Sequence, residues 1–318
     1  MQKKIENTIL IVTLAVLFLY FILNYNLSQA VKDVSSLRLY YIPYIILAWV
    51  AFTASKIFPW LLAIKKINVK MSLIRSFMMM YAFFGVGSTS LAVGQLIPLR
   101  ELENFRKNSK FFSFTIIFFL GVTSGIAALF LAVISSIALS RFTIYLLFAL
   151  SALYIAISAL RFEAPYNKAK ALVNHYKKIR KSKFAKTAIK YINGMKKQRG
   201  LMAQKYLILG TALFIPSIVF ESLLIVLILA SFNVSISIFA GIFVFTVAVS
   251  IGNASGLPSG VGPEDIAIVA LLLLFGVPGV LALSTLLIFR FLNTFLVIVS
   301  GYASLGLFKF IKIKGIKV

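Results

Sequence analysis

The sequence contains no cysteine and a single histidine, His175. The absence of cysteine excludes disulfides, thiolate nucleophiles and metal sites with cysteine ligands. The signatures HExxH, GxSxG and the phosphate-binding P-loop are also absent, so zinc-protease, serine-hydrolase and nucleotide chemistry have no support. We therefore expect no cofactor and no metal, and the sequence favours a protein that is not an enzyme.

Charged residues are scarce as well. They make up 13% of the 318 residues, against 61% hydrophobic residues, and the mean hydropathy is +0.99. Thirty residues between Lys110 and Arg141 carry no charge, enough for a helix to cross a hydrocarbon core of about 30 Å. We predict an all-α, polytopic integral membrane bundle that forms one transmembrane domain, residues 1–318. The predicted spans are residues 8–27, 39–63, 111–138, 142–160, 206–231 and 279–305.

Two further apolar stretches, residues 72–99 and 234–277, are interrupted by glycine and proline. A full crossing by residues 72–99 would place the most basic loop outside, against the positive-inside rule. This stretch is therefore predicted to dip in from the cytoplasmic side and return. The second stretch either enters from outside and returns or crosses as short broken segments. One broken or re-entrant segment in each half is typical of an inverted repeat with its binding site at mid-membrane.

Basic residues are concentrated in one loop. The net charge is +25, and 14 of the 33 Lys and Arg residues lie from Arg161 to Lys205. We predict a cell-membrane protein whose termini and basic loop, about residues 162–205, are cytoplasmic, with anionic membrane lipids rather than nucleic acid as partners. Residues 166–197 are predicted to form two helical pieces on the membrane surface. A solvated connector, or a docking site for a protein partner, is the alternative.

Five of the eight acidic residues lie in or beside membrane segments: Glu101, Glu103, Glu221, Glu264 and Asp265. An ionised carboxylate in hydrocarbon is costly, so such groups face a partner, a cavity or a coupled ion. Arg290 is a lone cation in its apolar segment, and its expected partner is Glu221, Glu264 or Asp265. The amides of Gln95, Asn253 and Asn293 serve either a binding site or contacts between helices.

Pro263 suits the first position of a helix, and two acids follow it. Acids in a first helical turn are favoured by the helix dipole, so helix capping alone accounts for Glu264 and Asp265. Gly260 and Gly262 would also let the backbone approach a ligand, and the free N–H groups of a helix start suit a phosphate. Both interpretations stay open at this point.

Two motifs resemble those of a known family. Residues 98–106, PLRELENFR, resemble P-x-R-x-G-E-x-x-R, with Leu102 in the glycine position. Residues 258–265, PSGVGPED, resemble P-G-G-x-G-x-x-E, with Ser259 in place of a glycine and Asp265 at the acidic position. Arg290 and Gly301 also fit the pattern. Over nearly its whole length the chain is similar to the transmembrane region of lysylphosphatidylglycerol synthases.

The resemblance implies a flippase-like domain that moves a phospholipid or a lipid-linked phosphate headgroup between leaflets. Its candidate substrate-binding or ion-coupling residues are Pro98, Arg100, Glu103, Arg106, Glu221, Asn253, Pro258, Gly260, Gly262, Glu264, Asp265 and Arg290. The arginines would engage a lipid phosphate, and the acids would balance charge or bind a coupling proton.

Other readings of the sequence stay open. The synthases carry a soluble aminoacyl-transfer domain after this region, whereas this sequence ends at Val318, so synthase activity is not expected. An intramembrane lipid-modifying enzyme and a non-transporting partner of a lipid or glycan synthase are the alternatives. A homo-oligomer is compatible with all three readings.

Overall fold

The computed structural model describes residues 38–67, 69, 71–89, 91–103, 112–140, 201, 203–255 and 260–313. Every regular element in these residues is helical, so the all-α prediction is confirmed. Four helices in this part are long and apolar enough to cross a membrane: Leu39–Lys66, Thr115–Leu139, Gln204–Ser231 and Gly279–Phe310. They coincide with four of the six predicted spans. The predicted spans 8–27 and 142–160 and the basic loop lie outside the described residues.

The first described span is interrupted near its middle. It consists of α3 (Ile42–Ser55) and α4 (Ile57–Lys66), with Lys56 between them. Pro59 explains the break, because it has no N–H to donate to the carbonyl of Ser55 and its ring crowds that carbonyl. Lys56 is thereby fixed at the point where the span bends.

The glycine- and proline-containing stretch that follows forms a helical hairpin. Helix α5 (Leu73–Gly87) begins after Ser72, whose hydroxyl accepts a hydrogen bond from the backbone N–H of Arg75 at 3.4 Å. Helix α6 (Leu91–Glu103) runs back alongside α5. At 1.5 Å per residue the two helices are roughly 22 and 20 Å long, shorter than the hydrocarbon core of about 30 Å. The long helix α7 (Phe112–Leu139) comes next.

The second half repeats this order. The long helix α12 (Gln204–Ser231) precedes a hairpin of α13 (Ile238–Ser255) and α14 (Pro263–Leu274). Helices α15 (Gly279–Arg290) and α16 (Leu296–Ile313) then form one long rod, joined by a π-helical segment, Phe291–Phe295.

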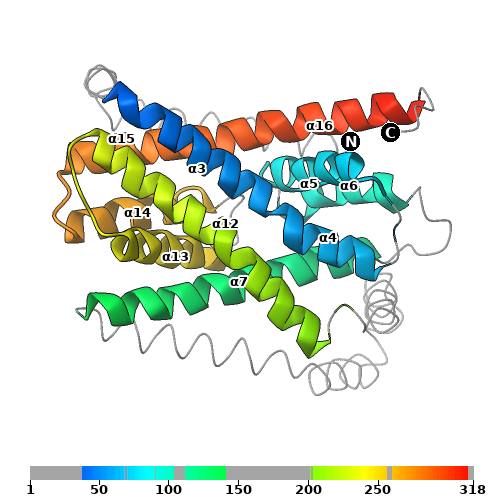
Figure 1. Cartoon of the computed structure of the whole chain (residues 1–318), viewed down its shortest axis with the longest axis horizontal. Helices are drawn as coiled ribbons and strands as arrows, with labels where there is room; N and C mark the ends of the chain where they lie inside the picture. Colours follow the sequence, from blue (N-terminus) through cyan, green and yellow to red (C-terminus); the bar gives the residue numbers. More distant parts are fainter. Residues whose placement is uncertain are drawn as a thin grey trace, which may run out of the picture.

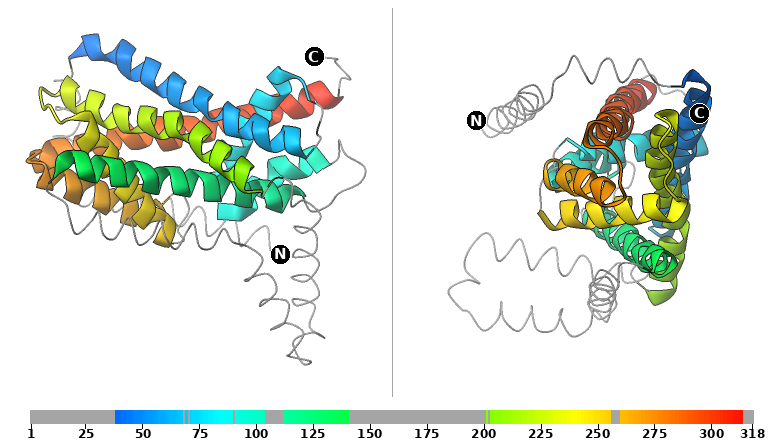
Figure 2. Two further views of the ribbon diagram at one scale, coloured as in Figure 1. Left: turned by 60° about the horizontal axis from the view of Figure 1, so that its bottom comes forward. Right: turned by 90° about the vertical axis from the view of Figure 1, so that its left-hand side faces the viewer.

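The corresponding helices of the two halves run in opposite directions (Figure 1). Helices α3 and α12 pack together and run in opposite directions. Helix α7 and the α15–α16 rod also run in opposite directions in the view of Figure 1. The α5–α6 hairpin starts and ends at one end of the bundle, and the α13–α14 hairpin at the other. Helix α5 packs on α16, and α13 packs on α7. An inverted repeat would produce this reciprocal packing. In the end-on view of Figure 2, α7 and α16 are seen along their length, whereas α3 and α12 cross the bundle obliquely.

Small residues allow α5 and α16 to pack closely. A Cβ added to Gly301 would lie 2.6 Å from the Cα of Gly85 and 2.8 Å from the carbonyl oxygen of Tyr81. These distances are too short for any side chain, so the two backbones touch where the helices cross. Close backbone approach through glycine is a common way to pack helices in lipid, where burial of apolar surface gives little driving force.

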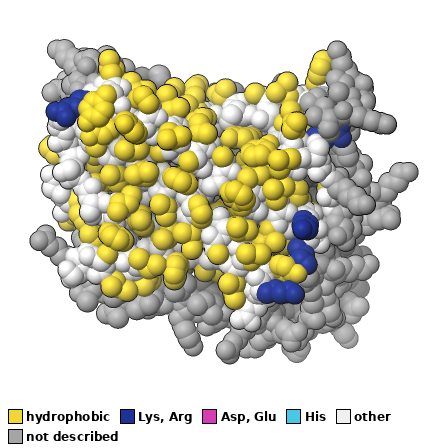
Figure 3. Space-filling model, in the orientation of Figure 1, with side chains coloured by type: hydrophobic (Ala, Val, Ile, Leu, Met, Phe, Trp, Pro, Cys, Tyr) yellow, Lys and Arg dark blue, Asp and Glu magenta, His cyan; other side chains and the backbone are white. Residues whose placement is uncertain are grey.

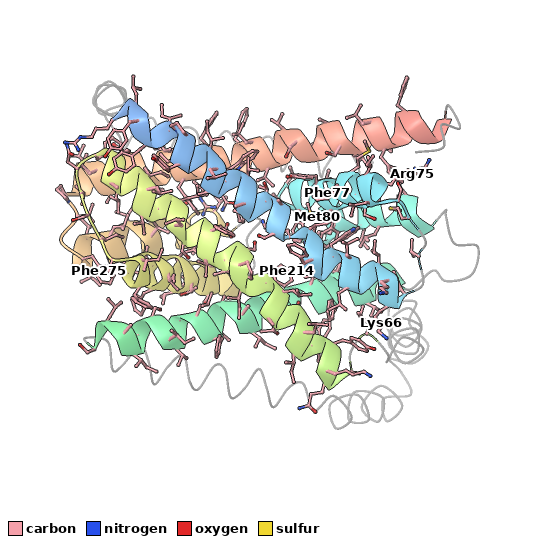
Figure 4. The ribbon with its side chains drawn as sticks, in the orientation of Figure 1. Lys66, Arg75, Phe77, Met80, Phe214 and Phe275 are labelled. Carbon is pink, nitrogen blue, oxygen red and sulfur yellow. The ribbon has the colours of Figure 1, made fainter. Side chains whose placement is uncertain are left out.

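The outer surface is suited to lipid. The face shown in Figure 3 is mainly hydrophobic, and its described Lys and Arg side chains lie toward the ends of the bundle. In Figure 4 Lys66 and Arg75 lie at one end, whereas Phe275 lies at the other. Charged side chains that lie between these ends are found inside the bundle, and they form the site described next.

Candidate functional site

Arg290 is the centre of an ion-pair cluster inside the bundle. Its Nε donates a hydrogen bond to Oδ1 of Asp265 at 2.5 Å, and its Nη2 lies 3.3 Å from Oε1 of Glu264. The three side chains are 13%, 10% and 8% exposed, respectively. The sequence offered three acidic partners for Arg290. The structure shows two of them in contact with it, Asp265 and Glu264, both from the second hairpin. In the described residues Arg290 forms no ion pair with Glu221.

The start of α14 explains how Asp265 is held. Pro263 occupies the first helical position, as predicted, and Oδ2 of Asp265 accepts a hydrogen bond from the backbone N–H of Gly262 at 2.8 Å. This contact caps the helix. Its other oxygen, Oδ1, bonds Arg290. Helix capping and a pair with Arg290 were both expected for this carboxylate, and the structure shows both.

Glycines make room for Glu264. A Cβ on Gly252, in α13, would lie 2.9 Å from the Cβ of Glu264 and 3.1 Å from the Cα of Gly260. Gly260 also has a φ of +63°, which side-chain-bearing residues rarely adopt. The two backbone segments therefore approach each other closely beside the carboxylate. In the described residues these glycines serve the packing of Glu264.

A second polar pair, between the buried Glu221 and the half-buried Asn293, joins α12 to the π-helical segment. Asn293 Nδ2 donates a hydrogen bond to Oε1 of Glu221 at 2.5 Å. Thr294 follows, with its Oγ1 3.5 Å from Nη1 of Arg290. A π-helical turn inserts an extra residue and shifts the following side chains around the helix, a feature frequent at functional sites. Here it starts directly after Arg290 and contains both Asn293 and Thr294.

These groups surround a cavity of about 200 Å³ between the two hairpins. It is lined by Lys56, Phe84, Ser88, Glu221, Phe245, Val249, Asn253, Glu264, Arg290, Asn293, Thr294 and Val297. The lining comes from both halves of the chain, with Phe84 and Ser88 from the first hairpin and Asn253 and Glu264 from the second. Two cationic and two carboxylate side chains thus face one space inside the bundle. The described residues contain no group of three or more side chains suited to hold a metal.

The structure brings together many, but not all, of the predicted site residues. Glu221, Asn253, Glu264 and Arg290 line the cavity, and Gly260, Gly262 and Asp265 adjoin its walls. Pro98 is buried within α6 and does not line it. Arg100 and Glu103 lie on α6, but their side chains are outside the described residues, as are Arg106 and Pro258 entirely.

Sequence reasoning missed Lys56. It was counted inside an apolar span, residues 39–63, although a lone ionisable residue within a span is itself a signal of function. Asn293 was considered only as an amide for a binding site or for contacts between helices, and the sequence carried no sign of the π-helical turn that contains it.

Comparison with known families matches residues 8–301 to the family described as Lysylphosphatidylglycerol synthase TM region. The match covers nearly the whole chain and confirms the resemblance seen in the two motifs. No curated protein matches the chain.

Proposed function

The chain belongs to the lysylphosphatidylglycerol synthase transmembrane-region family, and on this premise we propose that it is a lipid translocase. It would move the headgroup of a phospholipid or a lipid-linked phosphate between leaflets. The family indicates a membrane domain linked to lipid handling. The observation that carries the proposal is the cavity with its charged lining, inside the bundle and between two hairpins from opposite ends.

The two hairpins supply the architecture for a path across the bilayer. We propose that both are re-entrant, since each returns to the end at which it began, and since α5, α6 and α14 are shorter than the hydrocarbon core of about 30 Å. Irregular backbone at membrane depth is tolerated where it is buried in protein or lines a wet cavity. The α5–α6 hairpin would separate the cavity from one leaflet, and the α13–α14 hairpin from the other.

The charges in the cavity supply the chemistry. A headgroup phosphate loses its hydration when it enters hydrocarbon, at a cost of several kcal/mol or more. Fixed donors such as the ammonium of Lys56 and the amide of Asn293 replace part of that hydration at the middle of the path. The acyl chains stay in lipid, outside the bundle. Arg100 and Arg106, in the first family motif, would receive the phosphate near the end of the first hairpin.

A transport assay with the purified protein in liposomes tests the proposal. Fluorescent phosphatidylglycerol and a fluorescent polyprenyl phosphate are placed in the membrane, with and without a pH gradient, and the label exposed outside is quenched over time. We expect movement by the wild type and at least tenfold slower movement by Glu221→Gln and Glu264→Gln. Lys65→Met, at the exposed end of α4 and outside the cavity, is the matched control.

Folded protein that moves neither lipid would refute the translocase proposal. Product formation from either lipid would favour the enzyme reading. Co-purification of a synthase that depends on residues 166–197 would favour the partner-subunit reading. Equal rates in the wild type and both cavity variants would show that any movement bypasses the cavity.

A further inference from the structure

The two cations of the cavity differ in how their charge is balanced. Arg290 is held by two carboxylates, through a hydrogen bond to Asp265 and an ion pair with Glu264. Both partners come from the first turn of α14. Its guanidinium therefore has a structural task, because it fixes the start of α14 against the end of α15. A ligand anion at Arg290 would have to compete with both carboxylates.

Lys56 has a different environment. Its Nζ lies 3.9 Å from the centre of the Phe52 ring and 5.0 Å from the centre of the Phe84 ring. In the described part of the chain no carboxylate lies within 4.0 Å of this ammonium. Aromatic faces attract a cation, but they leave its three N–H donors to stronger acceptors. The ammonium of Lys56 is therefore the cation in this cavity that a ligand oxygen can engage directly.

The cavity is also polarised. Lys56, Phe84 and Ser88 line it from the first half of the chain. Glu221, Glu264 and Arg290 line it from the second half, where the guanidinium of Arg290 is already paired with Glu264 and Asp265. Glu221 is held at its own side of the cavity by the hydrogen bond from Asn293. An anionic group that enters the cavity is attracted to the first-half wall and repelled by the second.

We propose that Lys56 binds the phosphate of the transported lipid. The break in the span at Pro59 places this side chain at the cavity, and the two phenylalanine rings keep the ammonium there without neutralising it. The inference rests on the proposed function, since it assigns the headgroup contact within the same cavity. It also separates the roles of two residues: Lys56 selects the phosphate, and Arg290 positions the second hairpin.

Binding to the full chain in detergent tests the assignment apart from transport. The ligands are dioctanoyl phosphatidylglycerol, dioctanoylglycerol, which lacks the phosphate, and inorganic phosphate. Binding is followed by tryptophan fluorescence and by the ligand-dependent rise in unfolding temperature. We expect Lys56→Met to weaken binding of the phospholipid by about tenfold to hundredfold, the value of a charge-assisted hydrogen bond. Dioctanoylglycerol should bind the wild type and this variant alike.

Three further variants keep the result interpretable. Lys56→Arg retains the charge and should retain most of the binding, and Lys56→Gln provides a second neutral side chain if the methionine variant is unstable. Lys65→Met makes the same change on an exposed residue of α4 and should bind as the wild type. Unchanged phospholipid binding by both neutral Lys56 variants would overturn the proposal.

The other outcomes separate the two proposals and the two sources of phosphate. Lys56-dependent binding with no transport by the wild type would support the phosphate site and refute the translocase. Transport by Lys56→Met at the wild-type rate, for both lipids, would refute the role of Lys56 and leave the translocase standing. Lys56-dependent binding of inorganic phosphate, without binding of the phospholipid, would overturn the assignment to a lipid.

Discussion

Asp265 uses one carboxylate oxygen to cap the start of α14 and the other to accept a hydrogen bond from Arg290, 25 residues later in the chain. The same carboxylate thus connects the tip of the second hairpin to the long rod that follows it. Both side chains are largely buried. A buried pair of this kind contributes little net stability but is costly to break, because the remaining charge has no partner.

Removal of the Arg290 charge alone should therefore destabilise the protein more than removal of this charge together with those of Asp265 and Glu264. We expect Arg290→Met to lower the free energy of unfolding by about 3–5 kcal/mol, because it leaves Asp265 and Glu264 buried without their cation. The triple variant with Asp265→Asn and Glu264→Gln should recover part of this loss. Unfolding of the purified protein in mixed detergent micelles measures the difference. If the three substitutions lower the free energy of unfolding additively, Arg290 is not energetically coupled to Asp265 and Glu264, and the prediction is wrong.

Asn293 should act on stability through Glu221. Replacement of Asn293 by leucine leaves a buried carboxylate without its amide donor, and we expect a loss of about 1–3 kcal/mol. In a Glu221→Leu background the same replacement should cost much less, since no acceptor is left unpaired. The comparison uses the same unfolding measurement. An equal cost in both backgrounds would assign Asn293 a packing role that is independent of Glu221.

The crossing of α5 and α16 should not tolerate a methyl group. Gly301→Ala puts a Cβ against the backbone of Gly85, so the helices must separate, and overpacking of this kind costs about 1–3 kcal/mol. Gly306→Ala, one and a half turns further along α16, is the matched control, because a Cβ there meets nothing within 4 Å. Alanine favours a helix over glycine, so the control should be neutral or slightly stabilising. Equal stability of the two variants would show that the contact is not tight.

Much of this fold follows from the sequence, and the parts that do not have physical causes. The described spans begin and end within a few residues of the uncharged runs, except that the last rod continues past residue 305 to Ile313. Clusters of glycine and proline marked both hairpins, because such clusters favour turns. Single prolines, such as Pro98 and Pro216, lie inside helices. The partner of Arg290 could not be chosen among three acids, since spacing along the chain gives no distance between helices.

The cavity was less predictable than the fold. Lys56 was hidden in an apolar run that is long enough to span without it, and its position depends on the break that Pro59 causes. Asn293 reaches Glu221 only because the helix is π-helical there. A pattern read at 3.6 residues per turn would direct it elsewhere. Charge and family motifs indicated Glu221, Glu264 and Arg290 but not Lys56, and packing decided which of these side chains meet.

The orientation of the bundle in the membrane gives the last prediction. The positive-inside rule places the end that carries Lys65, Lys66 and Arg75 in the cytoplasm, and the connection between α12 and α13 at the opposite side. The chain has no cysteine, so a single introduced cysteine is a clean reporter. Lys65→Cys and Ser235→Cys both change exposed residues at opposite ends.

A membrane-impermeant maleimide applied to intact cells should label the cysteine at position 235 and reach the one at position 65 only after permeabilisation. The unmodified chain should not be labelled under either condition. Labelling of both positions from outside would contradict the return of the α5–α6 hairpin to the end where it began, or the placement of the two ends on opposite sides. The reverse pattern would invert the topology and place the basic end outside, against the positive-inside rule.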